Sequence, residues 1–410
     1  RMSRPDRLTP ETAASRRWLS IVGIGEDGLD GVSKAGRRLI DAADLLAGGE
    51  RHLALIPDDG RDRLPWPSPF TAGLERLLSH RGRRVCVLAS GDPMSYGIGA
   101  TLARRIPPAE MIVVPAPGAF DLACARMGWA RADVETLTLH GRPLALLHAY
   151  LQPGARLLIL SENGTTPAAV AALLASRGYG QSRITVLERM GGPQERCRDW
   201  NEPDIAGLNT LAVECVADPG APLLPRSPGL PDEAFHHDGQ LTKRETRAAT
   251  LAALAPVPGQ LLWDVGAGCG SIAIEWMRHH PACRAVAVEP RRDRLALIAA
   301  NAESLGCPGL TVVEGKAPAA LDGLPPPDAV FIGGGVSAPG VFETCWQALP
   351  PGGRLVANAV TIKGEQTLIS AYAKLGGSLT RIAISRAEPI GPFSGWRPLM
   401  PVTQLALLKT

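Results

Sequence analysis

A glycine-rich turn in the second half of the sequence has the residue types and spacing that bind a nucleoside. The apolar segment Leu261–Val265 runs into Gly266, Gly268 and Gly270, after which a helical pattern begins. Glycines at such a turn let backbone N–H groups approach a ligand closely. Glu289 lies 19 residues after Gly270, at the end of a second apolar segment, where a carboxylate can accept both hydroxyls of a ribose. The pattern therefore predicts a nucleoside site.

The spacing of these glycines favours S-adenosylmethionine as the nucleoside. The pattern G-x-G-x-G differs from the G-x-G-x-x-G of dinucleotide folds, and no basic cluster follows it to hold a pyrophosphate. One alternative is that the glycines only make a tight turn and that Glu289 is a solvated strand end. The combination of strand, turn, helix and acid makes this alternative unattractive, and we interpret the segment as part of a methyltransferase.

Two turns in the first half give a weaker signal. An apolar segment ends at Gly23 and Gly25, which alone would suit any α/β protein. A second apolar segment stops at Gly91, Asp92 and Pro93, where a helical pattern begins. Pro93 suits a first helical position and Asp92 can cap the helix.

Strands and helices must position these turns, and the sequence predicts both. Before residue 218, short apolar segments alternate with helical stretches at 34–44, 97–105 and 167–177, which is typical of an α/β domain with mixed or parallel sheets. After residue 235 the alternation is regular and predicts a doubly wound sheet. Its expected elements are helix 242–254, strand 261–265, helix 271–279, strand 285–289, helix 291–305 and strands near 310–313 and 328–332.

A chain of 410 residues exceeds the size at which one hydrophobic core keeps growing, so two domains are expected. Prolines recur every third residue between 219 and 231, a rhythm that favours an extended segment and marks the boundary. We therefore predict a loose segment at 1–17, a first domain at 18–217, a proline-rich linker at 218–235 and a second domain at 236–410.

Composition excludes several classes of protein. Apolar residues make up 45% of the chain, and no apolar stretch approaches the roughly 18 residues of a membrane span. The eight cysteines include no C-x-x-C pair, and the net charge is only +3, with basic residues dispersed. Residues 1–17 lack the apolar core of a secretory signal. We expect a cytoplasmic protein with no metal site and with neither a membrane nor a nucleic acid as its partner.

The second half resembles the decarboxylating precorrin methyltransferase domain. The resemblance rests on the segments Phe235–Arg247, Trp263–Gly268, Glu314–Pro318 and Phe331–Gly335. It implies a Rossmann-like class I methyltransferase fold. The residues it implies for S-adenosylmethionine binding are Thr242, Gly266, Ala267, Gly268, Cys269, Gly270, Glu289 and Ala317. As a hypothesis, Lys243, Arg244 and Arg247 orient substrate carboxylates. His236 and His237 could be a proton-handling pair, but we interpret them as a polar loop and assign no catalytic acid or base.

The first half resembles the tetrapyrrole methylase family, which binds a folded S-adenosylmethionine between two α/β lobes. The turn at 91–93 carries the resemblance, together with Pro115–Phe120 and Glu188–Pro193. It implies cofactor contacts from Gly91, Asp92 and Pro93. The chain has Glu26 and Asp27 where many relatives have Pro-Gly, so Gly23 and Gly25 are not included.

Together the two resemblances imply methyl transfer to carbons 5 and 15 of precorrin-6Y. Loss of carbon dioxide from the ring C acetate would accompany it and give precorrin-8 in cobalamin biosynthesis. Relatives of the second half also imply a homo-oligomer, such as a tetramer formed through this domain. Two alternatives are a class I methyltransferase acting on RNA or protein, with a targeting module in the first half, and a non-catalytic module that binds a tetrapyrrole or S-adenosylmethionine.

Overall fold

The computed structural model describes residues 17–68 and 70–410, and these form two compact units. The first unit holds the described residues up to Arg142 together with Pro153–Ala221, and the second holds Pro143–Gln152 together with Pro222–Thr410. The predicted loose segment lies outside the described residues except for Arg17, which is exposed.

The first unit begins with a five-stranded parallel sheet in the order β3-β2-β4-β1-β5. Its central strands are rich in apolar residues and mostly buried, as parallel strands require, whereas the edge strand at 62–65 exposes Asp62 and Pro65. The strands are β1 (Leu19–Ile24), β2 (Leu45–Gly48), β3 (Asp62–Pro65), β4 (Val85–Ser90) and β5 (Met111–Val114). The helices are α2 (Lys34–Ala42), α3 (Glu50–Ala54), α4 (Phe70–Leu78) and α5 (Ile98–Leu102).

A second, mixed sheet completes this unit in the order β6-β7-β10-β8-β9. β10 pairs antiparallel with both β7 and β8, whereas β6 and β7 run parallel. The strands are β6 (Glu135–Thr138), β7 (Arg156–Leu160), β8 (Arg183–Glu188), β9 (Arg196–Asp199) and β10 (Asn209–Glu214), with helices α6 (Ala119–Met127) and α7 (Thr166–Ser176). Two sheets, each with its own helices, confirm the predicted α/β fold class for this half.

The second unit is built on a seven-stranded sheet in the order β13-β12-β11-β14-β15-β19-β16. The five strands β13, β12, β11, β14 and β15 are parallel to one another, and β19 is antiparallel to its two neighbours, β15 and β16. The strands are β11 (Leu261–Val265), β12 (Arg284–Glu289), β13 (Thr311–Glu314), β14 (Ala329–Ile332), β15 (Arg354–Ala359), β16 (Ser378–Ile382) and β19 (Val402–Leu408). The helices are α8 (Arg244–Leu254), α9 (Ser271–His279), α10 (Arg292–Ser304), α11 (Val341–Ala348) and α12 (Ile362–Leu375).

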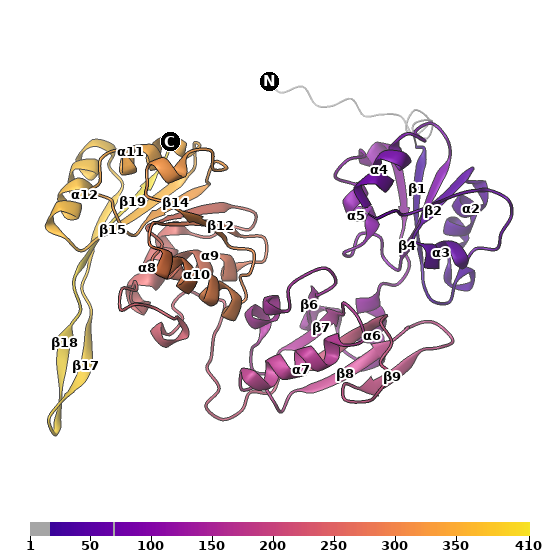
Figure 1. Cartoon of the computed structure of the whole chain (residues 1–410), viewed down its shortest axis with the longest axis horizontal. Coiled ribbons are helices and arrows are strands. Elements are labelled where there is room, and N and C mark those ends of the chain that lie inside the picture. Colours follow the sequence, from indigo (N-terminus) through magenta and orange to yellow (C-terminus); the bar gives the residue numbers. More distant parts are fainter. Residues whose placement is uncertain (1–16, 69) are drawn as a thin grey trace. The chain divides into compact units, whose positions relative to one another are not determined.

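This arrangement confirms the predicted doubly wound sheet. A hairpin of β17 (Ser385–Ile390) and β18 (Phe393–Pro398) pairs only with itself and extends away from the seven-stranded sheet (Figure 1). Within residues 17–68 and 70–410, no helix has both the length and the apolar character needed to cross a bilayer.

The proline-rich segment differs from the extended linker that the sequence predicts. The division between the units falls inside it, after Ala221. From there on, Leu224, Leu230 and Phe235 are buried in the core of the second unit. The regular spacing of the prolines does not reveal that the apolar residues between them pack against a neighbouring core. The segment after Ala221 is therefore part of the second unit and not a free linker.

Residues 143–152, from inside the predicted first domain, belong to the second unit. They include the 3-10 helix η4 (Leu144–Tyr150). The Arg226 Nε donates a hydrogen bond to the Ala149 carbonyl at 3.1 Å, and its guanidinium lies over the Tyr150 ring. Gln152 donates to the Leu224 carbonyl at 2.9 Å. The first half of the chain therefore contributes a short segment to the packing of the second unit.

Candidate functional site

The glycine turn of the second unit lies at the carboxyl end of β11, directly before α9. Gly266, Gly268 and Gly270 have φ values of 72°, 60° and 82°, a region that residues with side chains rarely adopt. A β-carbon at Gly266 would lie 2.7 Å from the Gly334 nitrogen. The turn therefore needs glycine both for its conformation and for its close approach to the loop after β14.

Glu289, the last residue of β12, supports this turn from the neighbouring strand. Its side chain is 2% exposed, and its Oε2 accepts a hydrogen bond from the Gly268 nitrogen at 2.8 Å. Its Oε1 accepts one from the Arg291 nitrogen at 3.1 Å. Each carboxylate oxygen can accept a further bond, so the arrangement fits a ligand with two hydroxyl donors.

The segment before α8 reaches the same turn. The Gln240 carbonyl oxygen lies 3.8 Å from the position of a β-carbon on Gly268. Asn301 of α10 donates to the carbonyls of both His236 and Cys269, at 2.9 and 3.0 Å. The structure thus joins segment 236–242 to the turn, as the predicted role of Thr242 requires.

Two of the remaining predicted residues, Ala267 and Cys269, lie in the turn itself. Ala267 is half-buried, and Cys269 is buried, which raises the pKa of its thiol. Ala317 follows β13 and is half-buried against the core. Asn301 holds the backbone of His236 through both its nitrogen and its carbonyl, whereas the His237 Nδ1 accepts locally from the Gly239 nitrogen.

Asp264 is a candidate residue that the sequence interpretation did not assign. It lies in β11 two residues before Gly266 and is 1% exposed. Its Oδ2 accepts a hydrogen bond from the Ala273 nitrogen at 3.0 Å, while its Oδ1 has no partner among the described residues. Burial raises its pKa to about 7, and the nearby charge of Glu289 adds to this. An acid inside an apolar strand was the signal that could have identified it.

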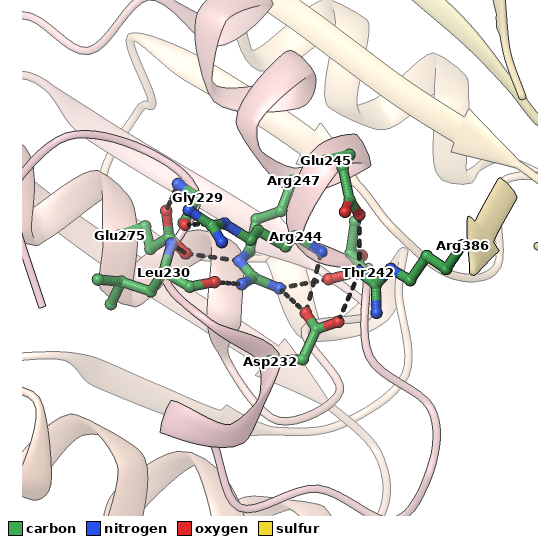
Figure 2. Close-up of polar contacts among 9 residues, drawn as sticks. All are labelled: Gly229, Leu230, Asp232, Thr242, Arg244, Glu245, Arg247, Glu275 and Arg386. Atoms are coloured by element: carbon green, nitrogen blue, oxygen red, sulfur yellow. Dashed lines mark hydrogen bonds and ion pairs between the residues drawn. The ribbon is translucent and has the colours of Figure 1, made fainter. Parts of the chain in front are cut away.

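The three predicted substrate-binding cations differ in exposure. Lys243 is half-buried and Arg244 is exposed, with its Nε donating to the Gly229 carbonyl at 2.8 Å. Arg247 is fully buried and contacts the carboxylates of Asp232 and Glu275 (Figure 2). This burial contradicts a substrate-binding role for Arg247, because internal acceptors already occupy its guanidinium.

The first unit has its candidate site at the carboxyl ends of β1, β4 and β5. The Gly91 nitrogen donates to the Ile24 carbonyl and the Gly91 carbonyl accepts from the Ala116 nitrogen, both at 3.1 Å. A β-carbon at Gly23 would lie 1.9 Å from the Gly91 oxygen. Three strand ends therefore meet with their backbones in contact, at the edge where open parallel sheets bind ligands.

The turn after β4 differs from the predicted helix start. The Asp92 Oδ1 accepts a hydrogen bond from the Met94 nitrogen at 2.8 Å, which closes a local turn. Pro93 is buried, and α5 begins only at Ile98. Asp92 therefore shapes a loop between strand and helix, and this loop leaves Met94 and Tyr96 about half exposed.

A polar cluster beside this turn was not predicted from the sequence. His52 hydrogen-bonds the Ser90 hydroxyl at 2.8 Å, Arg51 donates to the same hydroxyl at 3.1 Å, and Arg51 pairs with Glu26. Burial, and then the charge of Arg51, lower the pKa of His52 to about 4. His52 is therefore neutral near pH 7.

Comparison with known proteins defines the class first. Residues 19–206 match the model of the tetrapyrrole (corrin/porphyrin) methylases, and residues 233–409 match that of the precorrin methyltransferase domain. The chain is thus a methyltransferase of two different domains, one in each half.

Relatives then define the particular family. The chain is 50% identical to a precorrin-6Y C(5,15)-methyltransferase (decarboxylating) from Sinorhizobium sp, over 98% of this chain and 99% of that protein. It is 44% identical to the Mycobacterium tuberculosis protein of the same name, over 95% and 99%. A crystal structure of the C-terminal domain of the Rhodobacter capsulatus protein of that name shares 46% identity, covers 45% of this chain and 100% of that one, and has a TM-score of 0.43. The chain belongs to the precorrin-6Y C(5,15)-methyltransferase (decarboxylating) family.

Proposed function

We propose that this protein transfers methyl groups from S-adenosylmethionine to carbons 5 and 15 of precorrin-6Y. It also removes the carboxyl group of the ring C acetate, giving precorrin-8 in cobalamin biosynthesis. The observation that carries the proposal is that each unit has its own glycine-lined turn at the carboxyl edge of a parallel sheet. End-to-end similarity to relatives of that name supports the same two-site chemistry.

In the second unit, the described side chains fit a nucleoside with a sulfonium. When bound, S-adenosylmethionine supplies an electrophilic methyl group, so positioning provides much of the catalysis. Glu289 would accept the ribose hydroxyls, and Thr242, Ala317 and the 266–270 turn would line the rest of the site. Gly333 to Gly335 offer a wall without side chains, which suits a broad, flat substrate.

Decarboxylation needs no residue that forms a covalent bond to the substrate. The bond between the acetate methylene and its carboxyl carbon breaks, and the electron pair passes into the conjugated imines of the macrocycle. Carbon dioxide leaves, and a proton takes its place. Lys243 and Arg244 would orient carboxylates, since both are at least partly accessible beside the turn. We assign this step and methylation at carbon 15 to the second unit.

The first unit would methylate carbon 5, with Gly91, Asp92 and Pro93 forming part of its S-adenosylmethionine site. The glycine packing brings the strand ends close enough for backbone groups to contact a ligand. We place the protein in the cytoplasm, where relatives of this biosynthetic kind would meet their substrate.

We further propose that the chain forms a homo-oligomer, such as a tetramer, through the second unit. The hairpin β17–β18 exposes Ile390, Phe393 and Trp396, which are 64%, 76% and 76% exposed. A second copy of the same hairpin would cover these apolar side chains. Sedimentation of the F393S/W396S variant should show a smaller assembly than the unchanged chain. An unchanged mass would contradict this contact.

Mass spectrometry of precorrin-6Y incubated with the protein and S-adenosylmethionine tests the proposed reaction. We expect a product that has gained two methyl groups and lost one carbon dioxide. Omission of S-adenosylmethionine should leave the substrate unchanged. No change of mass in the complete mixture would contradict the proposal and direct attention to RNA or protein substrates.

A further inference from the structure

A network of ion pairs and hydrogen bonds joins α8, α9 and β17 in the second unit (Figure 2). Arg247 of α8 is at its centre and is 0% exposed. Its Nε donates to Glu275 at 2.5 Å and its Nη1 to Asp232 at 3.1 Å. It also donates to the carbonyl oxygens of Thr242 and Leu230, and its guanidinium lies over the Phe235 ring.

These contacts fix both walls of the cofactor turn. Thr242, whose carbonyl Arg247 holds, belongs to the segment that lies against Gly268. Glu275 belongs to α9, the helix that begins directly after Gly270. A planar guanidinium can hold several acceptors in one fixed geometry, which the point charge of a lysine cannot do. Arg247 therefore fixes the distance between the segment before α8 and the turn before α9.

The same network reaches the hairpin. Arg386, in β17, donates to the Asp232 Oδ2 at 3.0 Å and to the Glu245 Oε2 at 2.7 Å. Asp232 thus binds Arg247 through one oxygen and Arg386 through the other. The Arg244 nitrogen also donates to the Asp232 Oδ1, at 2.9 Å. The base of the hairpin and the start of α8 are held by one carboxylate.

We propose that Arg247 and Arg386 are positioning residues for the cofactor site of the second unit. Arg247 sets the geometry of Thr242 and of the 266–270 turn. Arg386 holds Asp232 in the orientation that Arg247 needs, so the hairpin is a structural component of the site. The inference rests on the proposed function only in naming S-adenosylmethionine as the ligand.

Arg386 is the residue to test, because its side chain is 35% exposed and its loss should leave the core folded. Arg397 provides a matched control, since it lies opposite Arg386 on the other strand of the hairpin and its side chain forms an ion pair with the exposed Glu388. The experiment compares Arg386→Gln, Arg386→Lys and Arg397→Gln in the full chain.

Hydrogen exchange without ligand is the first readout. Arg386→Gln should speed exchange about fivefold at 240–247 and 266–275, as expected for the loss of a partly exposed ion pair. The measured KM for S-adenosylmethionine in the decarboxylating reaction should rise about fivefold with kcat unchanged. Arg386→Lys should restore part of both effects, and Arg397→Gln should match the unchanged chain.

Two outcomes would overturn the inference. One is an Arg386→Gln variant that matches Arg397→Gln in both readouts. The other is faster exchange spread evenly over the second unit with no rise in KM, which a purely structural ion pair would give. If the unchanged chain does not decarboxylate precorrin-6Y, the proposed function fails, while the exchange pattern still decides whether Arg386 positions these segments.

Discussion

The two candidate sites use the same edge of a parallel sheet but are held together by different forces. In the first unit, Gly23, Gly91 and Ala116 meet backbone to backbone, and the ion pair beside them, between Arg51 and Glu26, is partly exposed. In the second unit, the buried carboxylates of Glu289 and Asp264 flank the turn, and a buried ion network supports it. An added side-chain atom should destabilise the closely packed backbones of the first unit, whereas the loss of one charged partner should destabilise the ion network of the second. The two units should therefore fail under different substitutions.

Removing the central guanidinium should have the largest effect on stability. Arg247→Met leaves the buried Glu275 without its cationic partner and leaves Asp232 paired with Arg386 alone, and breaking such a buried pair costs about 3–5 kcal/mol in comparable cases. Denaturant unfolding, followed by hydrogen exchange of each unit, should show the loss in the second unit alone. Arg381→Met, which breaks an exposed pair with Glu365, is the control and should cost about 1 kcal/mol or less. Equal losses of stability in both variants would show that the buried network contributes no more than an exposed ion pair, which would contradict the account.

Asp264 should make the second unit less stable as pH rises. Its pKa is raised from 3.8 to about 7, so the folded state holds a proton that the unfolded state releases between these values. Stability should fall from about pH 4 to pH 7 and then level off. At about 1.4 kcal/mol per pKa unit, the upper limit is about 4 kcal/mol.

The Asp264→Asn variant tests this expectation. Denaturant unfolding of the second unit at pH 5 and pH 8 should differ less for the variant than for the unchanged chain. A pH dependence that survives the substitution would assign it to another group. Its S-adenosylmethionine affinity is a second readout, because the carboxylate lies beside the turn.

Adding one methyl group should disrupt the first unit. A β-carbon in Gly23→Ala would lie 1.9 Å from the Gly91 oxygen, and such overpacking costs about 2–3 kcal/mol. Gly207 is a matched control in the same unit, because nothing lies within 4 Å of its β-carbon position. Thermal unfolding should separate the two variants. Similar melting temperatures would show that the strand ends can move apart.

His52 should give the smallest effect, with the opposite pH sign to Asp264. Its pKa is lowered from 6.5 to about 4, so the unfolded state binds a proton first on acidification. This contribution to stability is present above about pH 6.5 and is lost as pH falls towards 4. Hydrogen exchange of the first unit at pH 5 and 7 should differ less in His52→Gln. An unchanged difference would exclude His52 as its source.

Much of the fold followed from the sequence because strands and helices are local patterns. The strand before Gly266, helix 271–279 and the acid at the end of β12 were all predicted near their observed bounds. The predicted helical stretch 97–105 begins within one residue of α5, but Pro93 is not at a first helical position, because a side-chain turn at Asp92 comes before the helix. Local signals cannot reveal such competition between a loop and a helix.

The errors at the site came from contacts that are distant in sequence. Arg247 was assigned to substrate, but its partners Asp232 and Glu275 lie 15 and 28 residues away in the chain. Charged residues in a polar stretch give no sign of burial until the fold brings their partners together. Leu224 and Leu230 are also buried by residues distant in sequence, although the regular spacing of prolines predicted an extended linker there.

The central claim is that two independent sites act in one chain. Its most direct test is mass spectrometry of the precorrin-6Y product made by the Asp92→Ala and Glu289→Ala variants, each alone. We predict that each variant still adds one methyl group, and that only Asp92→Ala still releases carbon dioxide. If either substitution abolished both methylations in a protein that remains folded, the two units would not be separate sites, and the account would be wrong.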